Sequence, residues 1–137
     1  MGSVSTIGLD DLISDLSSLA ELPNSVIDDM LKAEADVIEP EQHRMAKSMG
    51  VYRTGVTEGS IKRTAVKSGS DGRYLSIYPQ GKNADGNSNA EVAFINEFGK
   101  RGQPARPFID TANKNKTDQA VGAAEKVYNA FVDGKNL

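Results

Sequence analysis

The chain has 137 residues, with no cysteine, no tryptophan, one histidine and a hydrophobic fraction of 38%. This length predicts a single domain over residues 1–137, and the lack of cysteine excludes disulfides and thiolate metal sites. No stretch approaches the roughly 18 apolar residues of a membrane span, and the acidic N-terminus lacks the apolar core of a secretory signal. Because histidine is the commonest acid/base and metal-binding residue, a single copy argues against an enzyme.

The net charge of −3 hides a division along the chain. Residues 1–43 carry a net charge of −9, residues 44–73 carry +5, and residues 74–137 carry +1. Such asymmetry often marks a surface that meets a partner. Three interpretations stay open: two solvated faces, an acidic part of one subunit that meets the basic part of the next, and nucleic-acid binding by the basic segment.

Residues 9–49 are expected to be helical, after a flexible polar start at residues 1–8. The first helix spans residues 9–22 and ends at Pro23, with acidic residues in its first turn. Its apolar residues recur at helical spacing: Leu9, Leu12, Ile13, Leu16, Leu19, Ala20 and Leu22.

A second helix follows, capped by Asn24 or Ser25. Its apolar stripe consists of Val26, Ile27, Met30, Leu31, Ala35 and Ile38. Pro40 is expected to kink or break this helix, because proline lacks a backbone N–H and its ring collides with the preceding turn. Residues 41–49 then form another helical stretch, which stops at Gly50 in a C-cap position.

Residues 50–106 change in character and predict a small sheet with loops. Ser60–Lys67 and Arg73–Tyr78 are rich in β-branched and aromatic residues, and the turn residues 68–72 between them include two glycines. This pattern predicts an antiparallel hairpin. In the second strand one face holds Leu75 and Ile77, and the other holds Tyr74, Ser76 and Tyr78.

Residues 79–89 form a polar loop with little to bury. Residues 90–98 are either a short helix, capped by Asn89, or a buried strand, since short apolar runs do not decide between the two. In the helical case one side carries Val92, Ile95 and Phe98. Residues 99–104 then form another loop.

The C-terminal helix is predicted over residues 107–133. Pro107 suits its first turn, and Gly134 can end it. The polar stretch 113–119 weakens the apolar stripe and is expected to be exposed or loosely held. The fold class is therefore α+β, with N-terminal helices, a small antiparallel sheet and a C-terminal helix packed on it.

Candidate chemical groups are few. His43 lies among charged residues on an expected helix and has no nucleophile or orienting group in a local motif, which predicts a solvated surface histidine. Residues 85–89 resemble the start of a calcium loop, but the glycine and glutamate that an EF-hand needs are replaced by Ala90 and Asn96. We therefore expect no catalytic residue, no metal and no cofactor.

Two islands of sequence are not explained by catalysis. The first reads Arg53-Thr54-Gly55 and then Ser60-Ile61. The second reads Ala93-Phe94-Ile95-Asn96-Glu97-Phe98-Gly99, a short basic loop, then Pro104-Ala105-Arg106-Pro107-Phe108-Ile109 and Ala112. Together, over about residues 50–112, the islands resemble the minor tail-component, or neck, family of long-tailed double-stranded DNA bacteriophages and prophages.

The resemblance implies a structural protein of the virion at the head–tail junction or in the tail, made in the cytoplasm of the host bacterium. Its implied partners are further copies of itself in a ring, such as a hexamer, and neighbouring connector or tail proteins. The ring lumen could contact DNA, and no membrane is involved. The lack of catalytic groups and the long polar loops agree with such a part.

The matching residues also receive physical roles. Gly55 and Gly99 are expected to supply a positive φ or a close backbone approach. Pro104 and Pro107 stiffen the loop and set the helix start.

Phe108 is expected to anchor the core. Arg106 has five fixed donors and suits a carboxylate, either Glu97 of the same chain or a group on a neighbouring subunit.

Two functions are therefore carried forward. The first is a non-enzymatic ring component that acts in head–tail joining or tail completion. The alternative is a nucleic-acid-binding module that uses the basic 44–73 segment through Arg44, Lys47, Arg53, Lys62, Arg63, Lys67 and Arg73.

Overall fold

A computed structural model describes residues 22–51, 55–70 and 72–135. The predicted flexible start at residues 1–8 and all but the last residue of the predicted helix 9–22 lie outside this part of the chain. The described elements, in chain order, are α2 (Asn24–Ser48), α3 (Val56–Gly59), β1 (Ile61–Arg63), β2 (Lys67–Gly69), β3 (Gly72–Tyr74), β4 (Ile77–Pro79), α4 (Asn89–Phe98) and α5 (Phe108–Lys135).

Helix α2 continues through Pro40 as one helix of 25 residues, so the expected break is wrong. Pro40 is exposed, and the stripe of buried residues continues on both sides of it, from Met30 to Ala46. Burial of this stripe offsets the roughly 3 kcal/mol that an interior proline costs. The predicted side-chain cap is also wrong: Pro23 occupies the N-cap, and its carbonyl accepts the backbone N–H of Val26.

The predicted stop at Gly50 is confirmed. Gly50 has φ 79°, and its N–H donates to the Lys47 carbonyl while the Val51 N–H donates to the Ala46 carbonyl. These two bonds form a Schellman motif, in which a left-handed glycine closes the helix. Val51 then packs with Met45 and Ala46, which fixes the direction in which the chain leaves α2.

The predicted antiparallel hairpin is confirmed, with a bulge that the sequence did not indicate. β1 pairs with β4, and β2 pairs with β3. Between the two ladders, residues 64–66 face only residues 75–76, so the first strand holds one extra residue. Such bulges bend and twist a hairpin. As expected for the second strand, Leu75 is buried and Tyr78 lies on the exposed face.

Residues 89–98 form helix α4, which resolves the choice between helix and strand. Ser88 is the N-cap, and its hydroxyl accepts the Glu91 N–H, so the predicted cap by Asn89 is one residue off. The buried face holds Asn89, Ala93 and Glu97.

Helix α5 is continuous over 28 residues and runs through Gly134, so the predicted end at Gly134 is wrong. In the polar stretch 113–119, Lys114, Asn115, Asp118 and Gln119 are exposed, as predicted, but the stretch is not loosely held. Asn113 accepts a hydrogen bond from Gln42, and Asn115 donates to Glu41, so this stretch is joined to α2 by amide contacts. An apolar stripe alone could not predict helix packing through side-chain amides.

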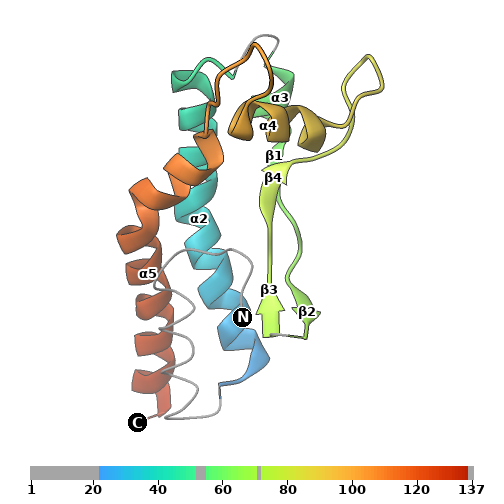
Figure 1. The fold of residues 1–137 in the computed structure, drawn as a ribbon. Helices are drawn as coiled ribbons and strands as arrows, with labels where there is room; N and C mark the ends of the chain where they lie inside the picture. The colour runs from blue at the N-terminus through green and yellow to red at the C-terminus, as the bar shows by residue number, and fades with distance from the viewer. Residues whose placement is uncertain (1–21, 52–54, 71, 136–137) are drawn as a thin grey trace.

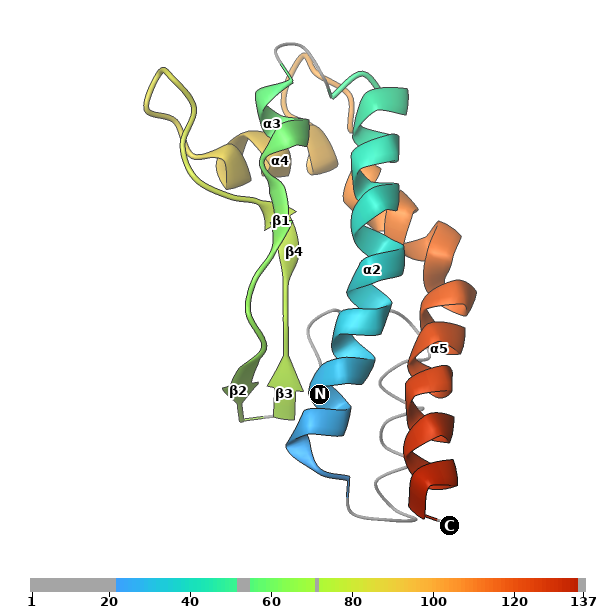
Figure 2. The ribbon, with the colours of Figure 1, turned by 180° about the vertical axis from the view of Figure 1, so that it is seen from behind.

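The two long helices run antiparallel, and the hairpin lies along the other side of α2 (Figures 1 and 2). We call the end with Ser48 and Phe108 the upper end, and the end with Asn24 and Lys135 the lower end; α3 and α4 lie at the upper end. The fold class α+β is confirmed. The C-terminal helix packs mainly along α2, and it meets the sheet through the shared core rather than lying flat on it.

The core has two clusters. The lower cluster joins α2, α5 and the hairpin, and its buried members are Leu22, Met30, Leu31, Ala35, Leu75 and Ala124. The upper cluster holds Met45, Ala46, Val51, Ile61, Ala93, Phe108 and Ala112. Ile77 packs against both. Over the described part of the chain, no helix combines the length and apolar character that a bilayer crossing requires.

Candidate interaction surface

The two sequence islands meet at the upper end of the molecule. One groove is lined by Gly55 from the first island, by Thr57 just after it, and by Asn96 and Arg106 from the second island. Its apolar lining includes Val51, Val56, Val92 and Ile95, and the polar loop after β4 contributes Asn83, Ala84, Asp85 and Asn87. Gly55 of the first island and several residues of the second therefore line one groove, although more than thirty residues separate the two islands in sequence. Thr54, predicted as part of the motif, lies outside the described residues.

Glu97 has a role that sequence reasoning missed. One carboxylate oxygen accepts the backbone N–H of Ile109 at 2.9 Å, and the other accepts that of Asp110 at 3.1 Å. Glu97 is only 8% exposed, and it lies at the N-terminus of α5, where the helix dipole favours a negative charge. The side chain therefore caps α5 from a different helix, α4.

Arg106 is not paired with Glu97, so the predicted intrachain pair is wrong. The Arg106 Nη1 donates to the Gly50 carbonyl at 3.2 Å, and the side chain is exposed. The Arg106 backbone N–H donates to the Asn96 carbonyl at 2.6 Å. Since Glu97 is already occupied by two amides of α5, the guanidinium instead joins the loop to the C-terminus of α2.

Gly99 explains why the second island needs a glycine. It has φ 78°, and a Cβ there would lie 2.8 Å from the Ala105 nitrogen and 2.9 Å from the Gln103 carbonyl oxygen. Both expected roles, a positive φ and a close backbone approach, are confirmed at this position. Gly55 also has a positive φ, of 76°, as predicted.

The loop from Gly99 to Pro107 is held by polar contacts with α4. Lys100 and Gln103 exchange backbone hydrogen bonds, and the Gln103 side chain donates to Asn96 at 3.4 Å. Pro104 is exposed in this loop, and the Pro107 carbonyl accepts the Thr111 N–H at the start of α5. Pro107 therefore sets the helix start, as expected.

The apolar members of the islands form the floor below this surface. Phe108 is fully buried, as predicted, and Ile61 is 2% exposed in the same cluster. The Ser60 hydroxyl donates to the Thr57 carbonyl and closes the short helix α3. These residues support the fold and carry no reactive group toward the groove.

Phe98 does not pack inward as the predicted apolar side of α4 required. Its exposed fraction is 66%, and that of Phe94 is 64%; their ring centroids lie 4.8 Å apart. The buried face instead follows Asn89, Ala93 and Glu97, because Glu97 must reach α5. An aromatic pair thus lies in the open at the upper end, on a neighbouring flank of α4.

His43 is not a solvated surface residue, which corrects the sequence-based interpretation. Its Nδ1 lies 2.6 Å from Glu58 Oε1, and its Nε2 lies 3.1 Å from the Ile61 carbonyl oxygen. The Lys47 ammonium lies 3.8 Å from the same Glu58 oxygen. The ring therefore ties α2 to α3 and β1, and neither His43 nor Glu58 lines the groove.

The opposed charge blocks are paired in part within one molecule. Arg63 on β1 bonds Asp36 at 2.7 Å and Glu39 at 3.1 Å, and Arg73 on β3 makes a bidentate pair with Asp28. The Arg73 hydrogen bonds lower the pKa of Asp28 below its ordinary value.

On α2, Arg44 donates two hydrogen bonds to Glu41, which is 4% exposed. These bonds lower the pKa of Glu41 to about 2, with a further contribution from Asn115. Glu41 also accepts the Asn115 amide, so the Arg44–Glu41 pair is joined to α5.

The loop once compared with a calcium site is closed by its own amides. The Asn83 side-chain oxygen accepts the backbone N–H groups of Asp85 and Asn87, both at 3.0 Å. Within residues 22–51, 55–70 and 72–135, no three acidic, histidine or cysteine side chains form a group that could hold a metal ion.

Comparisons with protein-family models, with curated proteins and with solved structures find no match to this chain.

Proposed function

We propose that this protein is a non-enzymatic structural component of a bacteriophage virion, which acts in the neck or tail and forms a ring. The observation that carries the proposal is the convergence of the two islands on one groove and one exposed flank of α4. The islands are the residues that resemble the phage family, and their described side chains form a helix cap, a turn and core contacts.

The architecture of the surface supports this role. Glu97, Gly99 and Arg106 hold α4, the loop and α5 in a fixed relation, so the groove and the aromatic pair are presented on a rigid frame. A rigid frame with exposed apolar groups favours protein contacts, because little conformational entropy is lost on binding. Further copies of the chain and neighbouring connector or tail proteins are the partners that this role implies.

Deletion of the coding sequence from the phage or prophage that carries it tests the proposal. Electron microscopy should then show filled heads and tails that fail to join, or defective tails, and a plasmid copy should restore infectious particles. Normal infectious particles without the protein would contradict the role.

A matched pair of variants tests the groove itself. Ala84 and Ala65 are both exposed alanines outside helices, but only Ala84 lines the groove. We expect Ala84→Asp to lower the titre of the complemented deletion at least tenfold, and Ala65→Asp to leave it within about twofold. Equal effects of the two variants would contradict a role for the groove.

The alternative, nucleic-acid binding by residues 44–73, receives less support. Four of its proposed basic residues form ion pairs: Arg44, Lys47, Arg63 and Arg73. Lys62 and Lys67 are exposed and form no ion pair within the described part of the chain. DNA affinity that falls steeply with salt and is lost on Lys62→Ala with Lys67→Ala would favour this alternative.

A further inference from the structure

Two of the four phenylalanines of the chain are exposed side by side on α4. Phe94 and Phe98 are four residues apart, so they share a face of the helix, and their rings are in contact. Ala93 and Glu97 are buried on the inner face of α4. Their burial fixes the rotation of the helix about its axis, so both phenylalanine rings face outward. Adjacent exposed aromatic side chains mark interaction surfaces, where aromatic residues are enriched.

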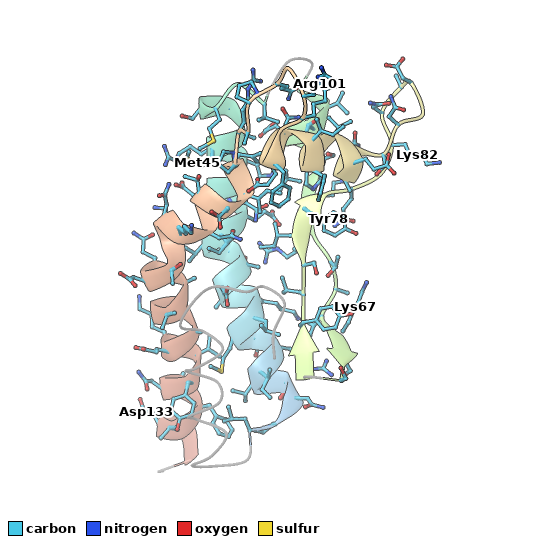
Figure 3. The ribbon with its side chains drawn as sticks, in the orientation of Figure 1. Met45, Lys67, Tyr78, Lys82, Arg101 and Asp133 are labelled. Carbon is cyan, nitrogen blue, oxygen red and sulfur yellow. The ribbon has the colours of Figure 1, made fainter. Side chains whose placement is uncertain are left out.

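Basic residues follow this aromatic pair directly. Lys100 and Arg101 are exposed in the loop after Phe98, and neither forms an ion pair within the described residues. Arg101 and Lys82 are both labelled at the upper end in Figure 3. Lys100 also lines the groove, which Phe94 and Phe98 do not line. We define Phe94, Phe98, Lys100 and Arg101, which are close in sequence and all exposed, as the aromatic–basic surface. Its chemistry fits a partner that is apolar on one side and acidic at its edges.

The chain itself contains a segment of that kind. Residues 9–22 carry the apolar stripe of an amphipathic helix, and residues 1–21 include four acidic residues and no lysine or arginine. The acids are Asp10, Asp11, Asp15 and Glu21. On α2, four of the six acidic side chains contact arginines of the same chain.

Geometry separates the segment from the surface of its own chain. The segment joins the described structure at Leu22, at the lower end, whereas α4 lies at the upper end (Figure 1). The 25 residues of α2 span about 37 Å, and a helix over residues 9–22 spans about 21 Å. The helix that the sequence predicts over residues 9–22 is therefore shorter than α2, so its length alone would not carry it from the lower end to the upper end.

We propose that residues 9–22 of one copy bind the aromatic–basic surface of the next copy. The leucine stripe covers Phe94 and Phe98, and the acidic residues face Lys100 and Arg101. Such a contact joins different surfaces of two identical chains, and repetition of it produces a closed ring or an open filament. This inference rests on the proposed ring function and names the contact that would build the ring.

A peptide of residues 1–22 tests the contact without requiring a complete ring. Fluorescence anisotropy at low salt measures binding of the labelled peptide to the full chain. The binding curve should saturate, and the affinity should fall as the salt concentration rises. Phe94→Ser with Phe98→Ser should weaken binding at least tenfold, and so should Lys100→Glu with Arg101→Glu. The matched control, Lys62→Glu with Lys67→Glu, makes the same charge change on the hairpin and should leave binding within twofold.

Charge reversal on both sides gives the sharper result. A peptide with Asp11→Lys and Asp15→Lys should bind the wild-type chain at least tenfold more weakly than the unmodified peptide, and should recover affinity for the Lys100→Glu, Arg101→Glu chain. Thermal unfolding of every chain variant must match the wild type, which is expected because all the altered side chains are exposed.

No peptide binding at millimolar concentration, or binding that ignores the phenylalanine and charge variants, would overturn the inference. A peptide effect confined to the stability of the single chain would show that residues 9–22 pack on their own molecule, and would overturn it as well. These outcomes are distinct from failure of the proposed function, which is decided by the particles formed after deletion of the coding sequence.

Discussion

Removal of the Glu97 carboxylate should destabilise the fold, because this side chain of α4 caps the N-terminus of α5. Glu97 accepts two backbone N–H groups in the first turn of α5 and is nearly buried. Hydrogen bonds to charged groups contribute about 1.5–3 kcal/mol each, whereas loss of a helix cap costs about 0.5–2 kcal/mol. Water can reach Asp110, which is exposed, so the total for Glu97→Ala should be about 2–4 kcal/mol.

Urea unfolding of the full chain, followed by circular dichroism, measures this loss. Glu97→Gln keeps one acceptor oxygen but removes the charge, so it should cost about half as much as Glu97→Ala. Glu125→Gln is the control, because Glu125 is exposed on α5, the helix that Glu97 caps. This substitution should change the free energy of unfolding by no more than about 0.5 kcal/mol. A loss below about 0.5 kcal/mol for Glu97→Ala would refute the capping role.

Three further predictions concern the loop, the acidic pairs and the hairpin. Gly99→Ala should lower the free energy of unfolding by about 2–4 kcal/mol, because the new Cβ would meet backbone atoms. Gly122→Ala places its Cβ in open space on α5 and should raise the free energy of unfolding by about 0.5–1 kcal/mol. Calorimetry of the two variants measures this difference. Because the pKa of Glu41 is lowered from 4.5 to about 2, its contribution is present above pH 4.5 and is lost as the pH falls toward 2. Glu41→Gln should therefore flatten the acid limb of the stability profile, and an unchanged limb would contradict the pairing. A double-mutant cycle with Asp28→Asn and Arg73→Met should give a coupling energy of about 1 kcal/mol, and a value near zero would mean that the hairpin arginine is not held by α2.

Local signals predicted the elements that depend on their own residues. The stop at Gly50, the hairpin and the burial of Phe108 each follow from a pattern that is complete within a few positions. Pro40 shows the limit of such reasoning, because a local penalty was outweighed by a buried stripe that continues on both sides of it. The packing partner α5, some seventy residues later, supplies that burial.

The sequence predicted which residues belong to the candidate surface, but not which groups they contact. The sequence marked Glu97, Gly99 and Arg106, but of its two alternatives for the arginine the pair with Glu97 of the same chain does not form. No spacing rule links a glutamate on one helix to the first amides of another helix twelve residues later, so the cap was not predictable. Once Glu97 is directed inward, Phe98 is directed outward by the helical repeat, and the exposure of that ring follows from the same missed contact.

The position of the hairpin changes the interpretation of the division of charge along the chain. β1 and β3 lie beside α2, so Arg63 and Arg73 meet acids of the same molecule, and part of the opposition between residues 1–43 and 44–73 is internal. Only charged side chains that form no ion pair within the molecule are available to a partner. Lys100 and Arg101 lie in the loop at the upper end and form no ion pair within the described residues, so their charge is available to the contact between copies that we propose.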